Sequence, residues 1–124
     1  MLKVLKFGGS SMADAAQFAK IKAIVESDDS RRVVVVSAPG KRFKDDHKVT
    51  DLLYLCHAHV QYGVSCENIF QMIRERYEGI AKDCGLDIDL SADFDKLWRK
   101  LCDGADKDYV ASRGEYFAAK LMAA

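Results

Sequence analysis

A lysine, two glycines and a serine stand close together near the start of the chain, at Lys6, Gly8, Gly9 and Ser10. These residue types suit the binding of an anion such as a phosphate. Backbone N–H groups beside glycines can approach an anion closely, and a lysine adds a point charge. The pattern matches neither G-x-x-x-x-G-K-[ST] nor G-x-G-x-x-G, so taken alone it fits a plain strand-to-helix turn at least as well.

Polar side chains at later positions could hold a small substrate. Ser37 follows an apolar run, where open α/β sheets place ligands, although a hydroxyl there can equally complete a turn. Thr50 begins a predicted helix, where it suits a carboxylate or acts as an ordinary N-cap. Glu115 could pair with an ammonium group, and Gly114 costs about 1 kcal/mol relative to alanine in a helix, which indicates a close approach to the backbone. On the residues alone, Arg113, Gly114 and Glu115 are more typical of a solvated helix surface.

The elements that must position these residues begin with a βαβ unit. Residues 2–7 alternate as a strand does, and residues 33–36 form a β-branched run typical of a strand covered on both faces. Between them, apolar residues recur at helical spacing. Ser10 or Ser11 is expected to cap that helix, with Asp14 near the positive end of its dipole. Strand, helix and strand at this spacing predict parallel strands joined by a right-handed crossover.

After Pro39 the sequence predicts helices almost throughout. Residues 41–48 are nearly all charged and are expected to form a surface loop, with a lid over a substrate as the alternative. His57 and His59 are two apart on a predicted helix and do not face each other, so no metal pair is expected. Helices are predicted to start near residues 50, 65, 91 and 108, the first three ending at Gly63, Gly85 and Gly104.

Composition limits the possible classes of protein. The 124 residues suffice for one domain, and nineteen basic residues balance nineteen acidic ones. This balance argues against a dedicated nucleic-acid-binding or membrane-surface protein, since both usually carry a basic excess. No run reaches the length of a membrane span, and the N-terminus lacks a signal-peptide pattern. The four cysteines show no C-x-x-C spacing and are expected to be free thiols in a reducing, cytoplasmic compartment.

Four stretches, taken in order, resemble the aspartate kinase (aspartokinase) branch of the amino-acid kinase family. They are KFGGSS (6–11), VVVVSAPGK (33–41), KVTDLLY (48–54) and SRGEYFAAKLMA (112–123). Each stretch is a weak signal by itself, but the ordered set is specific and spans essentially the whole chain. KFGGSS together with SRGE distinguishes aspartate kinases from their relatives, such as acetylglutamate kinases.

The resemblance implies an α/β fold. Residues 1–124 would form the N-terminal part of a three-layer αβα sandwich, a βαβ unit followed by a helical segment, with the rest of the kinase domain and ACT regulatory domains absent from this chain. The complete enzyme would be a homo-oligomer that transfers the γ-phosphoryl group of ATP, used with Mg²⁺, to the β-carboxylate of L-aspartate. The product, 4-phospho-L-aspartate, begins lysine, threonine and methionine biosynthesis. Residues 1–124 alone are expected to be inactive.

The resemblance also implies roles for particular residues. Lys6 matches the lysine that contacts the transferred phosphate and would be catalytic. Gly8, Gly9 and Ser10 match the loop that cradles the ATP phosphate with backbone donors. The family pattern does not require arginine at position 113. The implied aspartate site comprises Ser37, Thr50, Arg113 and Glu115.

Two alternatives stay open at this point. A different amino-acid kinase, with glutamate or acetylglutamate as acceptor, would share the fold and the phosphate loop. A truncated paralogue that serves as a non-catalytic interaction module would keep the fold, lose nucleotide binding and recognise a protein partner.

Overall fold

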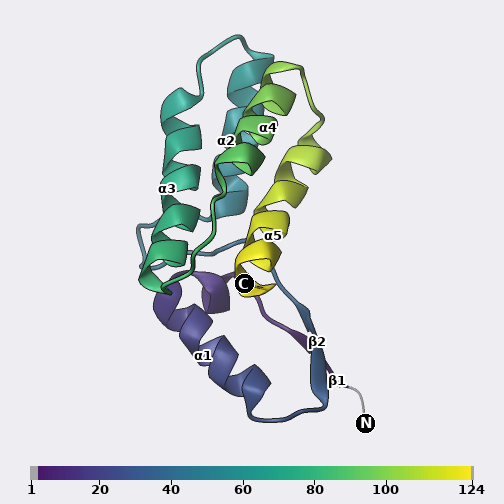
Figure 1. Ribbon diagram of the computed structural model, residues 1–124. Coiled ribbons are helices and arrows are strands. Elements are labelled where there is room, and N and C mark those ends of the chain that lie inside the picture. The colour runs from purple at the N-terminus through teal and green to yellow at the C-terminus, as the bar shows by residue number, and fades with distance from the viewer. Residues whose placement is uncertain (1–2, 124) are drawn as a thin grey trace.

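The computed structural model describes residues 3–123, which form a strand pair with one helix and a group of further helices (Figure 1). The strands are β1 (Lys3–Lys6) and β2 (Arg31–Val35). They are connected by a 3-10 turn, η1 (Gly9–Met12), and a helix, α1 (Ala15–Glu26). The other helices are α2 (Val49–Gln61), α3 (Glu67–Asp83), α4 (Ser91–Cys102) and α5 (Lys107–Ala123). Figure 1 shows α2–α5 packed side by side, with α1 and the strands at one end of them.

Strands β1 and β2 pair in parallel, as the βαβ pattern predicts. Val4 lies opposite Val33, and Lys6 lies opposite Val35, so these four side chains share one face of the sheet. In the described part of the chain this face is open, with Val4 61%, Val33 42% and Val35 44% exposed. The prediction that the valine run is covered on both faces is therefore wrong for residues 3–123, because α1 covers only the face that carries Val34.

The boundaries of the predicted strands differ slightly from the observed ones. The strand predicted at residues 2–7 is observed at Lys3–Lys6, and Leu2 lies outside the described residues. The Phe7 N–H still donates to the Val35 carbonyl oxygen at 3.0 Å, so pairing continues just beyond the strand. Strand β2 begins two residues before the predicted run.

Glycines end helices α2, α3 and α4, as predicted from the sequence. Gly63, Gly85 and Gly104 have φ angles of +68°, +69° and +85°, a backbone region that favours glycine. Helix α4 begins at Ser91 as predicted. The Ser65 hydroxyl accepts a long hydrogen bond of 3.4 Å from the Glu67 N–H at the start of α3. None of the helices within residues 3–123 is long and apolar enough to cross a bilayer.

The N-cap of α1 is Asp14, and the prediction of Ser10 or Ser11 in that role is wrong. The Asp14 carboxylate accepts a hydrogen bond from the Gln17 N–H at 3.0 Å. Both serines lie one turn earlier, in η1, because the chain first makes a 3-10 turn that begins at Gly9. Helix α1 therefore begins farther from the strand than a direct strand-to-helix turn would place it.

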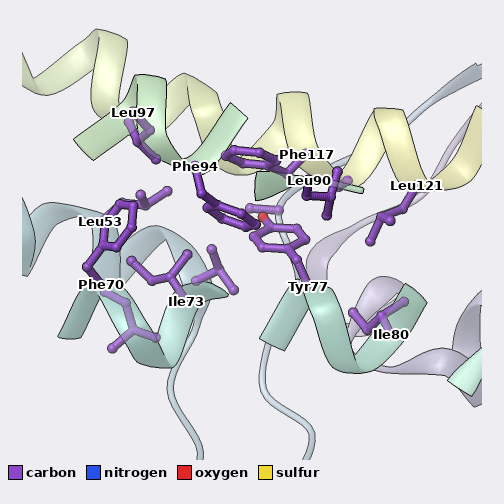
Figure 2. Close-up of a cluster of buried hydrophobic side chains, with 14 of the residues drawn as sticks. Leu53, Phe70, Ile73, Tyr77, Ile80, Leu90, Phe94, Leu97, Phe117 and Leu121 are labelled. Atoms are coloured by element: carbon purple, nitrogen blue, oxygen red, sulfur yellow. The ribbon is translucent and has the colours of Figure 1, made fainter. Parts of the chain in front are cut away.

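The core of the helical group is built around aromatic rings (Figure 2). Phe94 and Phe117 stack with ring centroids 4.3 Å apart, and Tyr77 contacts both rings. The buried Tyr77 hydroxyl donates to the Gly114 carbonyl oxygen at 2.6 Å, which satisfies its hydrogen-bonding need. Burial raises the pKa of Tyr77, so this hydroxyl stays a donor. Aliphatic side chains complete the core, among them Leu53, Ile73, Leu90, Leu97 and Leu121.

Candidate functional site

The loops that follow β1 and β2 touch through their main chains. The Gly40 N–H donates to the Gly9 carbonyl oxygen at 2.7 Å. A Cβ atom at Gly40 would lie 2.7 Å from the Gly9 carbonyl carbon and 2.8 Å from the Ser10 nitrogen. A Cβ atom at Gly9 would lie 3.0 Å from the Ala38 carbonyl oxygen. The two strand ends therefore meet only because Gly9 and Gly40 lack side chains.

The segments around Thr50 and Glu115 reach the same place. The Val49 N–H at the start of α2 donates to the Pro39 carbonyl oxygen at 3.0 Å. On α5, a Cβ atom at Gly114 would lie 2.8 Å from the Ala38 Cβ and 3.1 Å from Leu53 Cδ1. The close approach predicted at Gly114 is thus made by the protein's own Ala38 and Leu53. All four stretches that carry the family resemblance meet at residues 38–40.

Polar groups at this meeting point are left free. Lys6 is exposed at the end of β1 and forms no ion pair with any part of the chain that the structure describes. Gly8 is exposed, has an ordinary extended backbone (φ −79°, ψ 175°), and a Cβ atom there would meet nothing within 4 Å. The Gly9 carbonyl points at Gly40, so the N–H of Ser10 in the same trans peptide points the opposite way. A cation, a free N–H and an open glycine surface together can bind an anion.

Ser37 and Thr50 flank these loops. Ser37 is half-buried, two residues beyond the end of β2. Thr50 is also half-buried and is the second residue of α2, whose N-cap is Lys48, so the N-cap alternative for Thr50 is wrong. Within residues 3–123, the N–H groups of Thr50 and Asp51 find no acceptor, as is usual in the first turn of a helix. A helix start with two free N–H groups and a threonine hydroxyl can receive a carboxylate.

Glu115 and Arg113 lie on opposite sides of α5, because residues two apart on a helix point about 200° apart. Arg113 packs over the rings of Tyr109 and Tyr116, 4.9 and 4.8 Å from their centroids, and lines a small cavity between α4 and α5. Glu115 is exposed, and its charge adds to the effect of burial in raising the pKa of Tyr77. The contacts of Arg113 therefore place it against α4 and do not bring it to the strand-end loops.

Sequence reasoning missed Arg76, which is buried beside the loops. Its guanidinium donates to carbonyl oxygens of Ala13, Gly40 and His47, with distances of 3.0 Å from Nη2 to Ala13 and from Nη1 to His47. The signal for it was present in the sequence. Arg76 falls at helical spacing with the buried Ile73, Tyr77 and Ile80, so it lies on the apolar stripe of α3. An arginine on such a stripe needs buried partners.

The sequence predicted that the charged segment 41–48 is a surface loop. This is only partly correct, because Asp46 is buried. Asp46 is 8% exposed and accepts hydrogen bonds from Arg42 Nε at 2.6 Å and Nη2 at 3.0 Å, a bidentate pair. The Arg42 guanidinium holds the pKa of Asp46 well below its usual value. Arg76 adds a second cation, with Nη1 3.6 Å from Asp46 Oδ2. Lys41, Arg42, Phe43, Lys44 and Asp45 are exposed, as expected.

Comparison with known proteins gives one consistent result. Residues 1–124 match the sequence pattern of the amino acid kinase family. Aspartokinase 3 of Bacillus subtilis (strain 168) is 41% identical over 130 aligned residues, which cover 99% of this chain and 28% of that protein. The aspartokinase of Chlamydia muridarum (strain MoPn / Nigg) is 30% identical over 126 aligned residues, covering 96% of this chain and 26% of that protein.

A solved structure shares the same fold. The crystal structure of Clostridium acetobutylicum aspartate kinase matches 98% of this chain and 28% of its own length, with a TM-score of 0.95 and 45% identity. This match confirms the α/β fold class inferred from the sequence, as the N-terminal portion of an amino-acid kinase fold. The chain spans between 26% and 28% of the length of these relatives.

Proposed function

Because this chain belongs to the amino acid kinase family, we propose that the full-length protein is an aspartate kinase. It transfers the γ-phosphoryl group of ATP to the β-carboxylate of L-aspartate and forms 4-phospho-L-aspartate, the first step of lysine, threonine and methionine biosynthesis. Identities of 41% and 45% to two proteins named as aspartate kinases support this choice within the family.

The observation that carries the proposal is the meeting of the four stretches at residues 38–40, together with Lys6, which forms no ion pair with residues 3–123. Phosphoryl transfer needs little covalent help from the protein and depends on positioning and offsetting negative charge. In our proposal Lys6 contacts the transferred phosphoryl group and offsets the charge that develops on it. Gly8 gives the phosphate room, Ser10 donates its N–H, and Gly9 holds the loop in place.

The acceptor aspartate is proposed to lie between α2 and α5. Its carboxylates suit the Thr50 hydroxyl and the N–H groups at the start of α2 that find no acceptor within residues 3–123, and we propose that Ser37 borders the same site. Glu115 supplies the anion for the substrate ammonium, since it is exposed and forms no ion pair within residues 3–123. Arg113 is left out of this site because its guanidinium packs over two tyrosine rings against α4.

A more distant relative shares the fold and was solved with ligands bound. The structure of Escherichia coli aspartokinase III, 23% identical with a TM-score of 0.76, is a complex with aspartate and ADP. We propose that ATP is used with Mg²⁺. Within residues 3–123, no group of three or more His, Cys, Asp or Glu side chains could hold a metal ion.

The cysteines support a reducing compartment for the protein. Cys56, Cys66, Cys84 and Cys102 are all free thiols, as the sequence predicts. We therefore propose the cytoplasm as its location. Homo-oligomer formation stays a prediction from the family resemblance.

Gly8→Ala in the full-length protein is the sharpest test of the proposed phosphate site. The added Cβ meets no protein atom within 4 Å, and the backbone is ordinary, so the melting temperature should stay unchanged. If the phosphate lies against Gly8, aspartate-dependent release of ADP should fall at least about tenfold. Unchanged kcat and unchanged KM for ATP in this variant would show that the phosphate does not bind at this loop.

The same assay tests the acceptor. Aspartate, glutamate and N-acetylglutamate are supplied in turn to the wild-type full-length protein, and we expect turnover with aspartate alone. Turnover with either of the other acceptors would support a different amino-acid kinase. We also propose that residues 1–124 by themselves do not turn over aspartate, because they match less than a third of the length of the relatives.

A further inference from the structure

The Arg76 guanidinium is surrounded by main-chain carbonyl groups from three separate segments. It donates to the Ala13 carbonyl oxygen from Nε at 3.2 Å and Nη2 at 3.0 Å, and to the His47 carbonyl oxygen from Nη1 at 3.0 Å. Nη2 also donates to the Gly40 carbonyl oxygen. The side chain is 4% exposed, so water does not replace these bonds. One residue of α3 thus ties together the chain before α1, the loop after β2 and the segment before α2.

The buried charge of Arg76 is balanced by Asp46. Nη1 of Arg76 lies 3.6 Å from Asp46 Oδ2, and Arg42 holds the same carboxylate in a bidentate pair. An unpaired buried ion is strongly unfavourable, so this carboxylate keeps the guanidinium inside. The planar fork of five N–H donors can serve three carbonyl groups at once, and a lysine ammonium at the same position could not reach them in the same geometry.

Residue Gly40 links Arg76 to the proposed phosphate loop through its two main-chain polar groups. Its carbonyl oxygen accepts from Arg76, and its N–H donates to the Gly9 carbonyl oxygen at 2.7 Å. Because the Gly9 carbonyl is held in this direction, the N–H of Ser10 is directed away from Gly40, on the exposed side of the loop. The direction of this donor therefore depends on a chain of two hydrogen bonds that starts at Arg76.

We propose that Arg76 is a positioning residue for phosphoryl transfer: it fixes Gly40 and the chain at Ala13, and through them the Gly9–Ser10 peptide, whose N–H is proposed to bind the phosphate. The proposal rests on the proposed function of the strand-end loops, because Arg76 is buried and touches no substrate itself. It adds a residue from α3, outside the four stretches that resemble the family. A displacement of a donor by about 1 Å can lower a rate about 100-fold.

The test compares Arg76→Ala and Arg76→Lys with Arg74→Ala in the full-length protein. Arg74 is the matched control, because it lies on the same helix and bonds to the side chains of Glu78 and Ser91 instead of to the loops. We expect Arg76→Ala and Arg76→Lys to lower kcat for aspartate phosphorylation about 100-fold. Millimolar guanidinium should raise the kcat of Arg76→Ala about tenfold, because the free ion can occupy the space that the Arg76 side chain leaves between the carbonyl groups. Arg74→Ala should keep kcat within about twofold of wild type.

Melting temperature and ADP affinity separate this proposal from other outcomes. A fall in melting temperature with unchanged kcat per folded molecule in Arg76→Lys overturns it, and so does guanidinium rescue of melting temperature without rescue of kcat. If Arg76→Ala does not fold, Arg76→Lys alone decides between these results.

ADP binding, measured by calorimetry, also distinguishes the two proposals from each other. If wild type binds ADP but does not phosphorylate aspartate, the proposed function fails while Arg76 is still tested. ADP affinity about tenfold weaker in Arg76→Lys than in Arg74→Ala then supports positioning, and equal affinities overturn it. A wild-type protein that binds no ADP overturns both.

Discussion

The amide nitrogen of Gly40 lies 2.7 Å from the carbonyl oxygen of Gly9, so the loops after the two parallel strands touch through main-chain atoms. There is no room for a side chain on Gly40, whose Cβ would lie 2.7 Å from the Gly9 carbonyl carbon. Gly8 is different, because a Cβ atom there meets nothing within 4 Å. Neighbouring glycines in one loop thus differ: Gly9 allows contact between the loops, and Gly8 leaves an open surface, where we propose that the phosphate binds.

Replacing Lys6 tests the proposed catalytic charge. Lys6→Ala in the full-length protein should lower kcat about 10²- to 10³-fold, the usual effect of removing one donor to the transition state. The KM for aspartate should change much less, because the charge acts on the phosphoryl group. Lys3→Ala is the matched control, since Lys3 lies on the same strand but pairs with Asp28 at 2.7 Å. Steady-state ADP release measures both variants, and near-normal turnover in Lys6→Ala contradicts the role of Lys6.

Glu115→Gln tests the recognition of the substrate ammonium. Removing a charge-assisted hydrogen bond should weaken aspartate binding by roughly 1.5–3 kcal/mol, which would be measured as a higher KM for aspartate. The KM for ATP should stay the same. Arg113→Gln should change neither constant, because Arg113 packs over Tyr109 and Tyr116. Equal weakening of both substrates by Glu115→Gln would instead indicate that Glu115 supports the helix.

Two helical glycines should respond in opposite ways to alanine. Gly114→Ala places a Cβ atom 2.8 Å from the Ala38 Cβ and should destabilise the protein by about 1–3 kcal/mol. Gly79→Ala on α3 meets nothing within 4 Å and should stabilise it by about 0.5–1 kcal/mol. Chemical denaturation measures both free energies of unfolding. The double variant Gly114→Ala with Ala38→Gly should recover part of the loss, and failure to recover any would show that the clash with Ala38 is not its cause.

Acid should weaken the fold partly through Asp46. Arg42 holds the pKa of Asp46 below its usual value, so the folded state binds the proton less readily than the unfolded chain. The resulting stability is fully present above the unfolded pKa of about 4 and is lost as the pH falls through the lower folded pKa. Asp46→Asn should therefore be less stable than wild type near neutral pH and should lose less stability on acidification.

Urea midpoints measured from about pH 6 down to about pH 3 check this prediction. Arg42→Gln removes the cause of the shift and should flatten the same part of the curve. An unaltered slope in both variants would mean that other carboxylates dominate the acid response.

Much of the fold was predictable because its signals are local. The alternation before Gly8, the helical spacing and the valine run predict the βαβ unit, and Gly63, Gly85 and Gly104 end helices where a left-handed residue is needed. The cap of α1 was not predictable in the same way. Ser10 and Ser11 are good capping residues. However, Gly9, which contacts Gly40, begins a 3-10 turn that contains both serines, and the N-cap of α1 is therefore Asp14.

The candidate site was predictable in its residues more than in its construction. Lys6 and the glycines predict an anion site through their chemistry, and that site stays a prediction. The partners of Arg76 are main-chain carbonyls 29, 36 and 63 residues away in sequence, which the side-chain pattern did not predict. The pattern of side chains in a sequence does not predict the direction of a main-chain carbonyl group. The exposed Val33 and Val35 show a related difference. An apolar run indicates that a strand should be covered by other residues, but it does not show whether residues 3–123 include the ones that cover it.

The main-chain character of these contacts has a consequence for how such sequences can diverge. Arg76 binds the carbonyl oxygen of His47, and every residue type carries that group, so position 47 is free to change while the hydrogen bond is kept. Gly40 has no such freedom, because any larger residue meets the neighbouring loop. A library that varies both positions should therefore return many residue types at position 47 among active clones and only glycine at position 40. Broad acceptance at position 40 would show that the loops can separate without loss of activity.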